Sequence, residues 1–266
     1  MSDDKQLPEP TDNNAAASES ADNQLARLAE SSRQIAQMRE DWRHDHDFLD
    51  GQHLIYPEMR DKSVLDEYRN LRTRLLQRSE GRNAVTMVSG IGVGAGASLV
   101  ATNLAIAFAL DSAKTALLVD CHLKDPRLGK LLDVESGPGL TDYLMDEELG
   151  VEAILYQTGI PRLRMIPVGS HFESGQEFFT SFRMKAFLKA LKERYPDRFL
   201  IFSVPPLDDS ADSRILADLC DLAMLVAPYG RVTESRLLEV ANVVGKEKLA
   251  GVVLNRVPPN PLGLFG

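Results

Sequence analysis

The chain has 266 residues, of which 44% are hydrophobic and 26% charged, and its formal net charge is −9. This composition predicts one α/β domain of about 200 residues with an appended segment, and an acidic chain without a basic cluster argues against nucleic acid as a main partner. No apolar run reaches the roughly 18 residues that a membrane span needs, and the first residues lack a signal-peptide core, so we expect a cytoplasmic protein.

The N-terminal region differs in composition from the rest of the chain. Residues 1–22 are rich in Asp, Asn, Ser, Ala and Pro, which predicts a disordered acidic tail. Apolar residues from Asn23 to about Trp42 fall near one helical stripe, so we expect a helical extension and linker over residues 23–58. Two interpretations stay open: this helix lies on its own domain, or it docks a partner. The main domain is expected over residues 59–258, with a short tail over 259–266.

A second helix is predicted where that domain begins. The sequence Ser63-Val64-Leu65-Asp66 has the form of a capping box, and the apolar residues that follow have helical spacing. Asp66, Arg69 and Arg72 recur every three residues and step round a neighbouring face. From the spacing alone, such a face is typical of a solvated surface with salt bridges.

The richest pattern begins at Val85. A β-branched apolar run leads into a loop with the glycines Gly90, Gly92, Gly94 and Gly96, and an Ala- and Leu-rich segment follows. This order predicts a strand, a phosphate-binding loop and a buried helix, because glycines let backbone N–H groups turn inward and a helix N-terminus favours an anion. A phosphate-binding loop ends in Gly-Lys followed by Ser or Thr. Here Ser98 supplies the hydroxyl, but Ala97 stands at the lysine position.

Further apolar runs follow in regular alternation with helical segments. The run from Thr115 to Val119 predicts a central parallel strand that delivers Asp120, His122 and Lys124 to the carboxyl edge of the sheet. Later strands are expected at 164–169, 198–202, 222–227 and 249–254, and helices at 127–132, 140–145 and 182–195. The pattern predicts a three-layer α/β fold with a mostly parallel sheet between helices. Cys121 and Cys220 lie in apolar runs and are expected to be buried thiols.

The order of these pieces resembles the bacterial tyrosine-kinase family of exopolysaccharide and capsule synthesis, within the MinD- and ParA-like P-loop ATPases. The branch that accompanies exosortase-linked polysaccharide clusters is the most similar. The similarity covers about residues 60–258 and is specific because several motifs match in series at the right separations. They are Glu67 to Arg72, the glycine loop with Asn103 to Ala105, Leu117 to Asp120, Gly139 to Leu144, Tyr195 to Arg198, Pro205-Pro206 and Val252 to Asn255.

The resemblance implies a nucleotide site that this chain keeps only in part. Ser98 matches the magnesium-binding hydroxyl and Asp120 the first acid of the second motif. Ala97 replaces the loop lysine, His122 the second acid of that motif, and Ser203 the Walker B aspartate. The other nucleotide contacts that the resemblance implies are Gly90, Gly92, Gly94, Gly96, Leu99, Asp212, Asn255 and Arg256.

The three replacements remove charge from the places where phosphoryl transfer needs it. Losing one preorganised charge costs roughly 10²–10³ in rate, and a site of Ser98 and Asp120 alone would hold Mg²⁺ weakly. We therefore expect weak binding of ATP or ADP at best, and a doubtful magnesium site. A metal role for His122, or Lys124 as a substitute for the missing lysine, is a less favoured alternative.

The functional hypotheses follow from the resemblance and from these losses. The first is a catalytically degenerate scaffold, at the inner face of the cell membrane, that docks on the cytoplasmic segment of a Wzz-like polysaccharide copolymerase. Self-association, or association with a homologous kinase, would use Asp66, Arg69 and Arg72. The alternatives are a weakly active tyrosine kinase or ATPase, and a MinD/ParA-like positioning ATPase. The last needs a second lysine early in the loop, where Ile91 and Gly92 stand, and the C-terminal tyrosine cluster of the kinases is absent, since the last tyrosine is Tyr229.

Overall fold

A seven-stranded sheet forms the centre of the computed structural model, which describes residues 40–112, 114–135, 137–170, 175–194, 198–208 and 210–258. The strand order is β3-β4-β2-β5-β1-β6-β7, and all neighbouring strands are parallel except β3 and β4. The strands are β1 (Val85–Gly90), β2 (Thr115–Asp120), β3 (Tyr156–Gln157), β4 (Leu163–Ile166), β5 (Arg198–Val204), β6 (Leu222–Pro228) and β7 (Leu249–Asn255).

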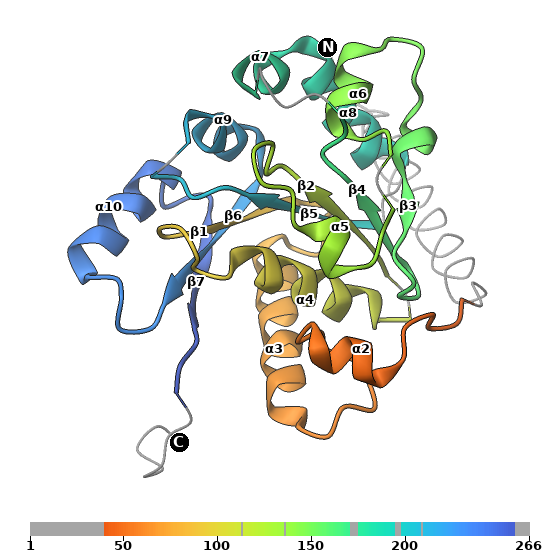
Figure 1. The fold of residues 1–266 in the computed structure, drawn as a ribbon. Coiled ribbons are helices and arrows are strands. Elements are labelled where there is room, and N and C mark those ends of the chain that lie inside the picture. The colour runs from red at the N-terminus through yellow and green to blue at the C-terminus, as the bar shows by residue number, and fades with distance from the viewer. Residues whose placement is uncertain are drawn as a thin grey trace, which may run out of the picture.

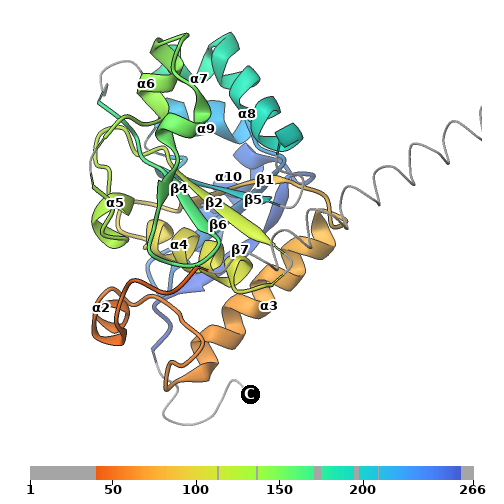
Figure 2. The same ribbon diagram turned by 90° about the vertical axis from the view of Figure 1, so that its right-hand side faces the viewer.

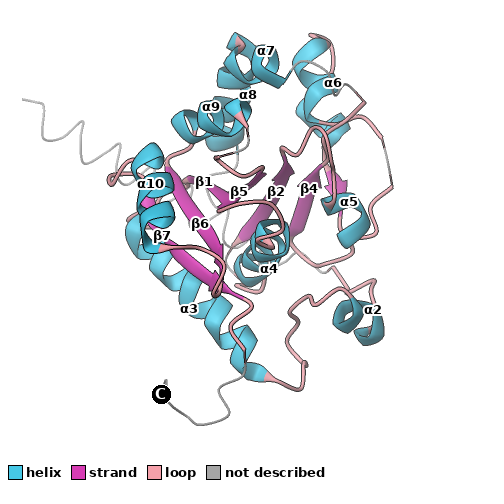
Figure 3. Cartoon of the chain, turned by 60° about the vertical axis from the view of Figure 1, so that its left-hand side comes forward, coloured by secondary structure: helices cyan, strands magenta, loops and turns pink. Residues whose placement is uncertain are grey.

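Helices cover both faces of this sheet (Figures 1 and 2). On one face lie α2 (His46–Gly51), α3 (Lys62–Arg78), α4 (Ala97–Ala109) and α5 (Leu128–Leu131). On the other lie α6 (Leu140–Met145), η1 (Val151–Ile154), α7 (Gly175–Thr180), α8 (Phe182–Arg194), α9 (Ala211–Leu219) and α10 (Glu234–Val244). Figure 3 shows the strands between α3 and α4 on one side and α9 on the other. The three-layer, mostly parallel α/β fold predicted from the sequence is therefore confirmed.

The central strands are apolar on both faces because both faces are buried. Successive residues of β2 alternate between the two cores: Leu117 and Val119 pack with the α6–α10 helices, and Leu118 packs with α3 and α4. All six residues of β1 and all six of β2 are buried. This explains why these strands read as continuous apolar runs rather than as alternating ones.

The described part of the predicted N-terminal extension, residues 40–58, packs on the domain. Leu49, Leu54 and Ile55 are at most 1% exposed and belong to the same core as α4. The side chain of Asn103 holds this segment, since its Oδ1 accepts the N–H of Ile55 and its Nδ2 donates to the carbonyl of His53, both at 3.0 Å. Residues 40–58 are thus part of the folded body.

Several local expectations need correction or fall outside the described residues. Helix α3 begins at Lys62, and its N-cap is Asp61, whose carboxylate accepts the N–H of Ser63 at 2.9 Å, so the predicted Ser63–Asp66 capping box is wrong. Residues 1–39 and 259–266, which include the predicted tails and most of the 23–42 helix, lie outside the described residues. Among the described helices, none has both the length and the apolar character needed to cross a bilayer.

Candidate functional site

A cavity of about 650 Å³ opens where β1, β2 and β5 end at the carboxyl edge of the sheet. Its floor is the glycine loop with the first turn of α4, residues 90 and 92–99. The opposite walls come from residues 121–125 after β2, from residues 204–206 at the end of β5, and from Gln52, Arg127, Lys130, Leu131, Ser210 and Asp212. Open α/β sheets bind ligands at this edge.

The loop has the backbone of a phosphate cradle. Gly92, Gly94 and Gly96 have φ values of 80°, 78° and 86°, a region that residues with side chains rarely adopt. Gly96 is also the N-cap of α4, and a Cβ atom there would lie 2.3 Å from Nδ2 of Asn255. The first N–H groups of α4 have no intrahelical partner and face the cavity end of the helix. The residues present therefore fit a phosphate group.

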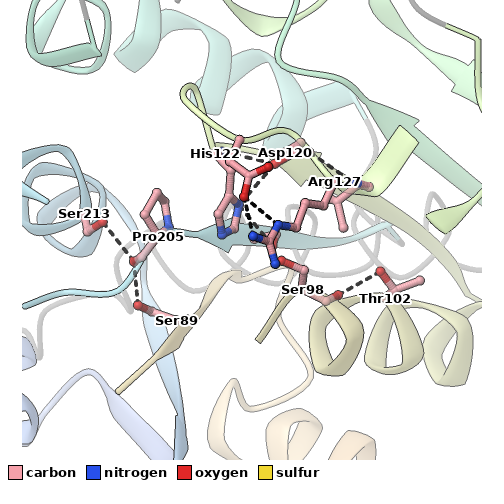
Figure 4. A network of polar contacts seen from close by, with 11 residues as sticks. Ser89, Ser98, Thr102, Asp120, His122, Arg127, Pro205 and Ser213 are labelled. Carbon is pink, nitrogen blue, oxygen red and sulfur yellow. Dashed lines mark hydrogen bonds and ion pairs between the residues drawn. The ribbon is translucent and has the colours of Figure 1, made fainter. Parts of the chain in front are cut away.

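The acid expected to hold Mg²⁺, Asp120, is hydrogen-bonded to other groups of the protein. Asp120 is fully buried, and its Oδ1 accepts the backbone N–H of His122 at 3.0 Å and lies 3.1 Å from the ring Nδ1 of the same residue. Its Oδ2 accepts the N–H of Leu128 at 3.2 Å. Figure 4 shows Asp120, His122 and Arg127 gathered above Ser98 in that view. Asp120 itself does not line the cavity.

Ser203 stands beside this pair but brings no charge. The sheet register pairs Asp120 with Ser203 across β2 and β5, and Ser203 Oγ lies 3.5 Å from Nδ1 of His122. Ser203 is fully buried. The ligands left for Mg²⁺ are then one hydroxyl and a carboxylate that is already hydrogen-bonded, and Mg²⁺ demands near-ideal octahedral oxygen geometry. The residues present do not fit a magnesium ion, and the described residues hold no cluster of three or more metal-binding side chains.

Charged side chains line the walls of the cavity. Lys124, Arg127 and Lys130 are all exposed cations, and Asp125 and Asp212 are the acids. Burial raises the pKa of Asp212, and the charge of Lys124 opposes that shift. Nε of Arg127 donates to Oδ2 of Asp125 at 2.7 Å, which lowers the pKa of that carboxyl.

Two of the expected nucleotide contacts, Asn255 and Arg256, do not line the cavity. Asn255 Nδ2 donates to the carbonyl of Ala95 at 2.8 Å, so its amide supports the glycine loop from behind. Arg256 is exposed, and its backbone N–H donates to Oδ1 of Asn255. By contrast Ser98, Leu99, Ala97, His122 and Asp212 do line the cavity together.

The three charged residues of the predicted contact face of α3 do not all point to solvent. Asp66 and Arg69 form an exposed ion pair at 3.0 Å. The guanidinium of Arg72 turns inward instead, where its Nη1 donates to the carbonyl of Ala107 at 2.9 Å in α4. The expectation that all three charges lie on one exposed face is therefore wrong for Arg72.

Sequence reasoning missed four residues near the site. Gln52 reaches the cavity from the N-terminal segment, and Arg127 and Lys130 from the start and the interior of α5. Asp208 accepts the N–H of Gly92 at 3.4 Å and pairs with Arg236 of α10 at 2.7 Å. The predicted strand end at Asp120 could have flagged Arg127 and Lys130, because the chain after such a strand follows the same sheet edge.

The chain matches no model of a known protein family. The putative tyrosine-protein kinase EpsB of Ralstonia solanacearum is 27% identical over 213 residues, which are 79% of this chain and 28% of that protein. The chain thus spans little more than a quarter of that relative. Tyrosine-protein kinase CpsD of Streptococcus agalactiae is 26% identical over 208 residues, which are 77% of this chain and 88% of that protein.

Solved structures give the same picture of the fold. The kinase domain of the Escherichia coli tyrosine kinase ETK has a TM-score of 0.67 and 21% identity, with 80% of this chain and 89% of that chain covered. The BceF tyrosine kinase domain has a TM-score of 0.63 and 26% identity, with 73% and 77% covered. The cell division ATPase MinD of Pyrococcus furiosus has a TM-score of 0.54 and 26% identity, with 66% and 76% covered. The homologues are bacterial tyrosine-protein kinases, with MinD- and ParA-type ATPases among the structural neighbours, which confirms the resemblance stated from the sequence.

Proposed function

We propose that this chain is a catalytically degenerate relative of the bacterial tyrosine kinases, acting as a partner or scaffold in exopolysaccharide or capsule synthesis. Its homologues support a place among the tyrosine-kinase-like proteins of those systems. The observation that carries the degeneracy is the environment of Asp120, which is fully buried and whose two oxygens are hydrogen-bonded to His122 and to the N–H of Leu128. Asp120 also does not line the cavity, so its carboxylate is not among the side chains that the cavity presents to a metal.

The missing charges support the same proposal. Ala97 lines the cavity floor where a lysine would meet the phosphates, and Ser203 is uncharged and buried. Phosphoryl transfer depends on charge placed in advance against the transferring group, so each lost charge lowers the rate by roughly 10²–10³. The lysine missing at Ala97 and the aspartate missing at Ser203 act on different parts of the phosphate chain, so we expect little turnover without them.

The proposed partners follow from the family rather than from a surface of this chain. They are the cytoplasmic segment of a membrane polysaccharide copolymerase, a second copy of the chain, and a homologous kinase. The proposed location is at the inner face of the cell membrane through such a partner. Weak binding of ATP or ADP is compatible with this role, because the loop still offers a phosphate cradle.

The test is a pair of assays on the purified full-length chain. We expect no Mg²⁺-dependent ATP hydrolysis and no tyrosine autophosphorylation above the background of a heat-denatured sample. A catalytically competent homologue assayed in parallel shows that the conditions support turnover. A turnover of roughly 1 s⁻¹, at the low end of ordinary kinases, would refute the proposal in favour of an active enzyme.

One observation keeps a weakly active enzyme as the second candidate. Lys124, Arg127 and Lys130 line the cavity and could replace the missing lysine in part. A positioning ATPase of the MinD or ParA kind has less support, since Ile91 and Gly92 occupy the loop positions where its second lysine belongs.

A further inference from the structure

We propose that the cavity binds a polyphosphate anion without a divalent cation, and that Arg127, with Lys124 and Lys130, supplies the positive charge of the absent loop lysine and metal. This inference rests on the proposed function, because it treats the glycine loop as a degenerate nucleotide site. The ligand class is a nucleoside di- or triphosphate or inorganic pyrophosphate. These share the diphosphate group that a glycine cradle recognises.

The cavity offers few ligands to a Mg²⁺ ion. Asp120 is fully buried and does not line the cavity, and its carboxylate oxygens already accept hydrogen bonds from the N–H groups of His122 and Leu128. Without that acid, a metal would keep only its contact with the hydroxyl of Ser98. Mg²⁺ surrenders its water reluctantly, so one neutral protein ligand does not hold it. The countercharge that this chain itself offers a phosphate is then on the cationic side chains that line the cavity.

Arg127 lines the cavity and pairs with Asp125. Its Nε and Nη2 both donate to the same oxygen, Oδ2, of Asp125. Its Nη1 has no hydrogen-bond partner among the described residues. The two side chains are 61% and 62% exposed, and ion pairs with that exposure are weak. An anion in the cavity can therefore take the guanidinium in a bidentate contact, the geometry in which arginine binds phosphate best.

The charges on the cavity walls do not balance. Three cations, Lys124, Arg127 and Lys130, face two acids, Asp125 and Asp212, so the walls carry a formal excess of one positive charge. The N-terminus of α4 adds partial positive charge at the floor. A metal-free polyphosphate carries two more negative charges than its Mg²⁺ complex. A positively charged cavity without a metal anchor favours the metal-free form.

The test is calorimetric titration of the full-length chain with ATP, ADP and sodium pyrophosphate, each with excess EDTA and with excess Mg²⁺. We expect binding in EDTA that is at least as tight as in Mg²⁺. Equal affinity for ATP and pyrophosphate would show that the site recognises only the polyphosphate and not the nucleoside. Tighter binding of ATP and ADP would assign a nucleotide, and either result supports the inference.

Two substitutions of opposite sign sharpen the test. Arg127→Ala should weaken binding in EDTA about tenfold or more, since it removes a charged donor. Asp125→Asn should strengthen binding, because it removes the competing carboxylate. The matched control is Arg82→Ala, which breaks another exposed arginine–carboxylate pair, with Glu80, outside the cavity lining and should leave affinity unchanged.

The inference fails if binding requires Mg²⁺, if no probe binds, or if Arg127→Ala and Arg82→Ala have the same effect. These outcomes are separate from a failure of the proposed function. Turnover with Mg²⁺ refutes the degenerate role whatever happens in EDTA. A chain that binds no polyphosphate but also turns nothing over keeps that role and loses only this inference.

Discussion

At the scale of single residues, Ala97 is the replacement whose effect is simplest to reverse. It is the first residue of α4, 9% exposed, and it lies on the cavity floor next to the cradle. We expect Ala97→Lys to raise affinity for ATP by roughly ten- to a hundredfold, because a hydrogen bond to a charged group contributes about 1.5–3 kcal/mol. Calorimetry in EDTA measures the change. Val64→Lys, on the exposed surface of α3, adds the same charge elsewhere and should change nothing.

The acids should act only through a metal. In the Ala97→Lys background, adding His122→Asp removes the imidazole that contacts Asp120, and Ser203→Asp adds a second carboxylate beside it. We expect the affinity of this triple variant for ATP to increase with Mg²⁺, unlike that of Ala97→Lys alone.

The control for both variants is Gly96→Val. Its backbone conformation is left-handed and its Cβ would meet the side chain of Asn255, so the cradle cannot keep its shape. Binding should be lost in every background. If the triple variant stays folded by circular dichroism but binds ATP no better than the natural chain, the loop geometry has drifted and the restoration idea is wrong.

At the scale of elements, one side chain of α4 adds hydrogen bonds to the packing that joins the N-terminal segment to the domain. Asn103 is 2% exposed and joins α4 to the backbone of His53 and Ile55. Asn103→Ala leaves the buried N–H of Ile55 without its acceptor, so we expect the free energy of unfolding to fall by about 1–3 kcal/mol. Urea denaturation measures it.

The matched control for that change is the neighbouring residue. Thr102→Ala removes a hydroxyl whose hydrogen bond among the described residues is to the carbonyl of Ser98 in the same helix. It should cost less than Asn103→Ala. Equal costs would mean that the amide does not join the two segments energetically.

The same segment contains a group whose ionisation stabilises the fold. The side chain of Arg164 donates to Glu40, and the N–H of Arg162 donates to its Oε2 at 2.9 Å. The hydrogen bond from Arg164 lowers the pKa of Glu40 below its usual 4.5, although burial opposes the shift. A lowered folded-state pKa means that the stabilisation is complete above the unfolded value and is lost as pH falls through the folded one.

We therefore expect Glu40→Gln to flatten the acid limb of the stability curve. Above about pH 5 the natural chain should be more stable than the variant, and the difference should shrink as pH falls below about 4.5. Thermal unfolding as a function of pH measures both proteins. A difference that stays constant over this range would show that the carboxylate charge contributes nothing.

Which elements the sequence predicts depends on how strongly local pattern determines them. The strands β2 and β6 are continuous buried runs, and the glycine loop needs its own residues for its backbone, so both follow from local sequence. Helix α2 falls within the predicted helical extension and linker over 23–58, but its six residues are too few for a periodicity and its bounds were not predicted. The capping error at α3 arose because Asp61 and Ser63 are two capping residues in one short stretch.

The site was predicted to the same extent and for the same reason. Motif order predicts the floor residues Ala97 and Ser98 and the strand-end residue Asp120, because each lies in a single local element, the start of α4 or the end of β2. Gln52 reaches the cavity only through tertiary packing of a segment distant in sequence. The imidazole of His122 contacts the carboxylate of Asp120 instead of facing away from it. This depends on the side-chain rotamer of His122, which residue spacing does not predict.

At the scale of the whole molecule, the question is which charges stabilise the monomer and which remain for an assembly. The guanidinium of Arg72 donates to the carbonyl of Ala107. This carbonyl is one of the last four of α4, which receive no N–H donor from within the helix. It stabilises the monomer. Asp66 and Arg69 are 59% and 47% exposed and contribute little to it, since pairs with such exposure are worth about 0–1 kcal/mol.

This division makes opposite predictions for two arginines on one helix. If α3 forms a contact with a second copy or with a homologous kinase, Arg69→Glu should lower the mass measured by light scattering and leave the unfolding midpoint unchanged, because it reverses a charge only at the contact. Arg72→Ala should do the reverse: it should lower the free energy of unfolding by about 1–2 kcal/mol, for a partly buried bond from a charged donor, without changing the mass of the folded fraction. Equal masses for the natural chain and Arg69→Glu, alone and mixed with the homologue, would leave the pair as a solvated surface feature. The contact would then have to be sought on another face of the domain.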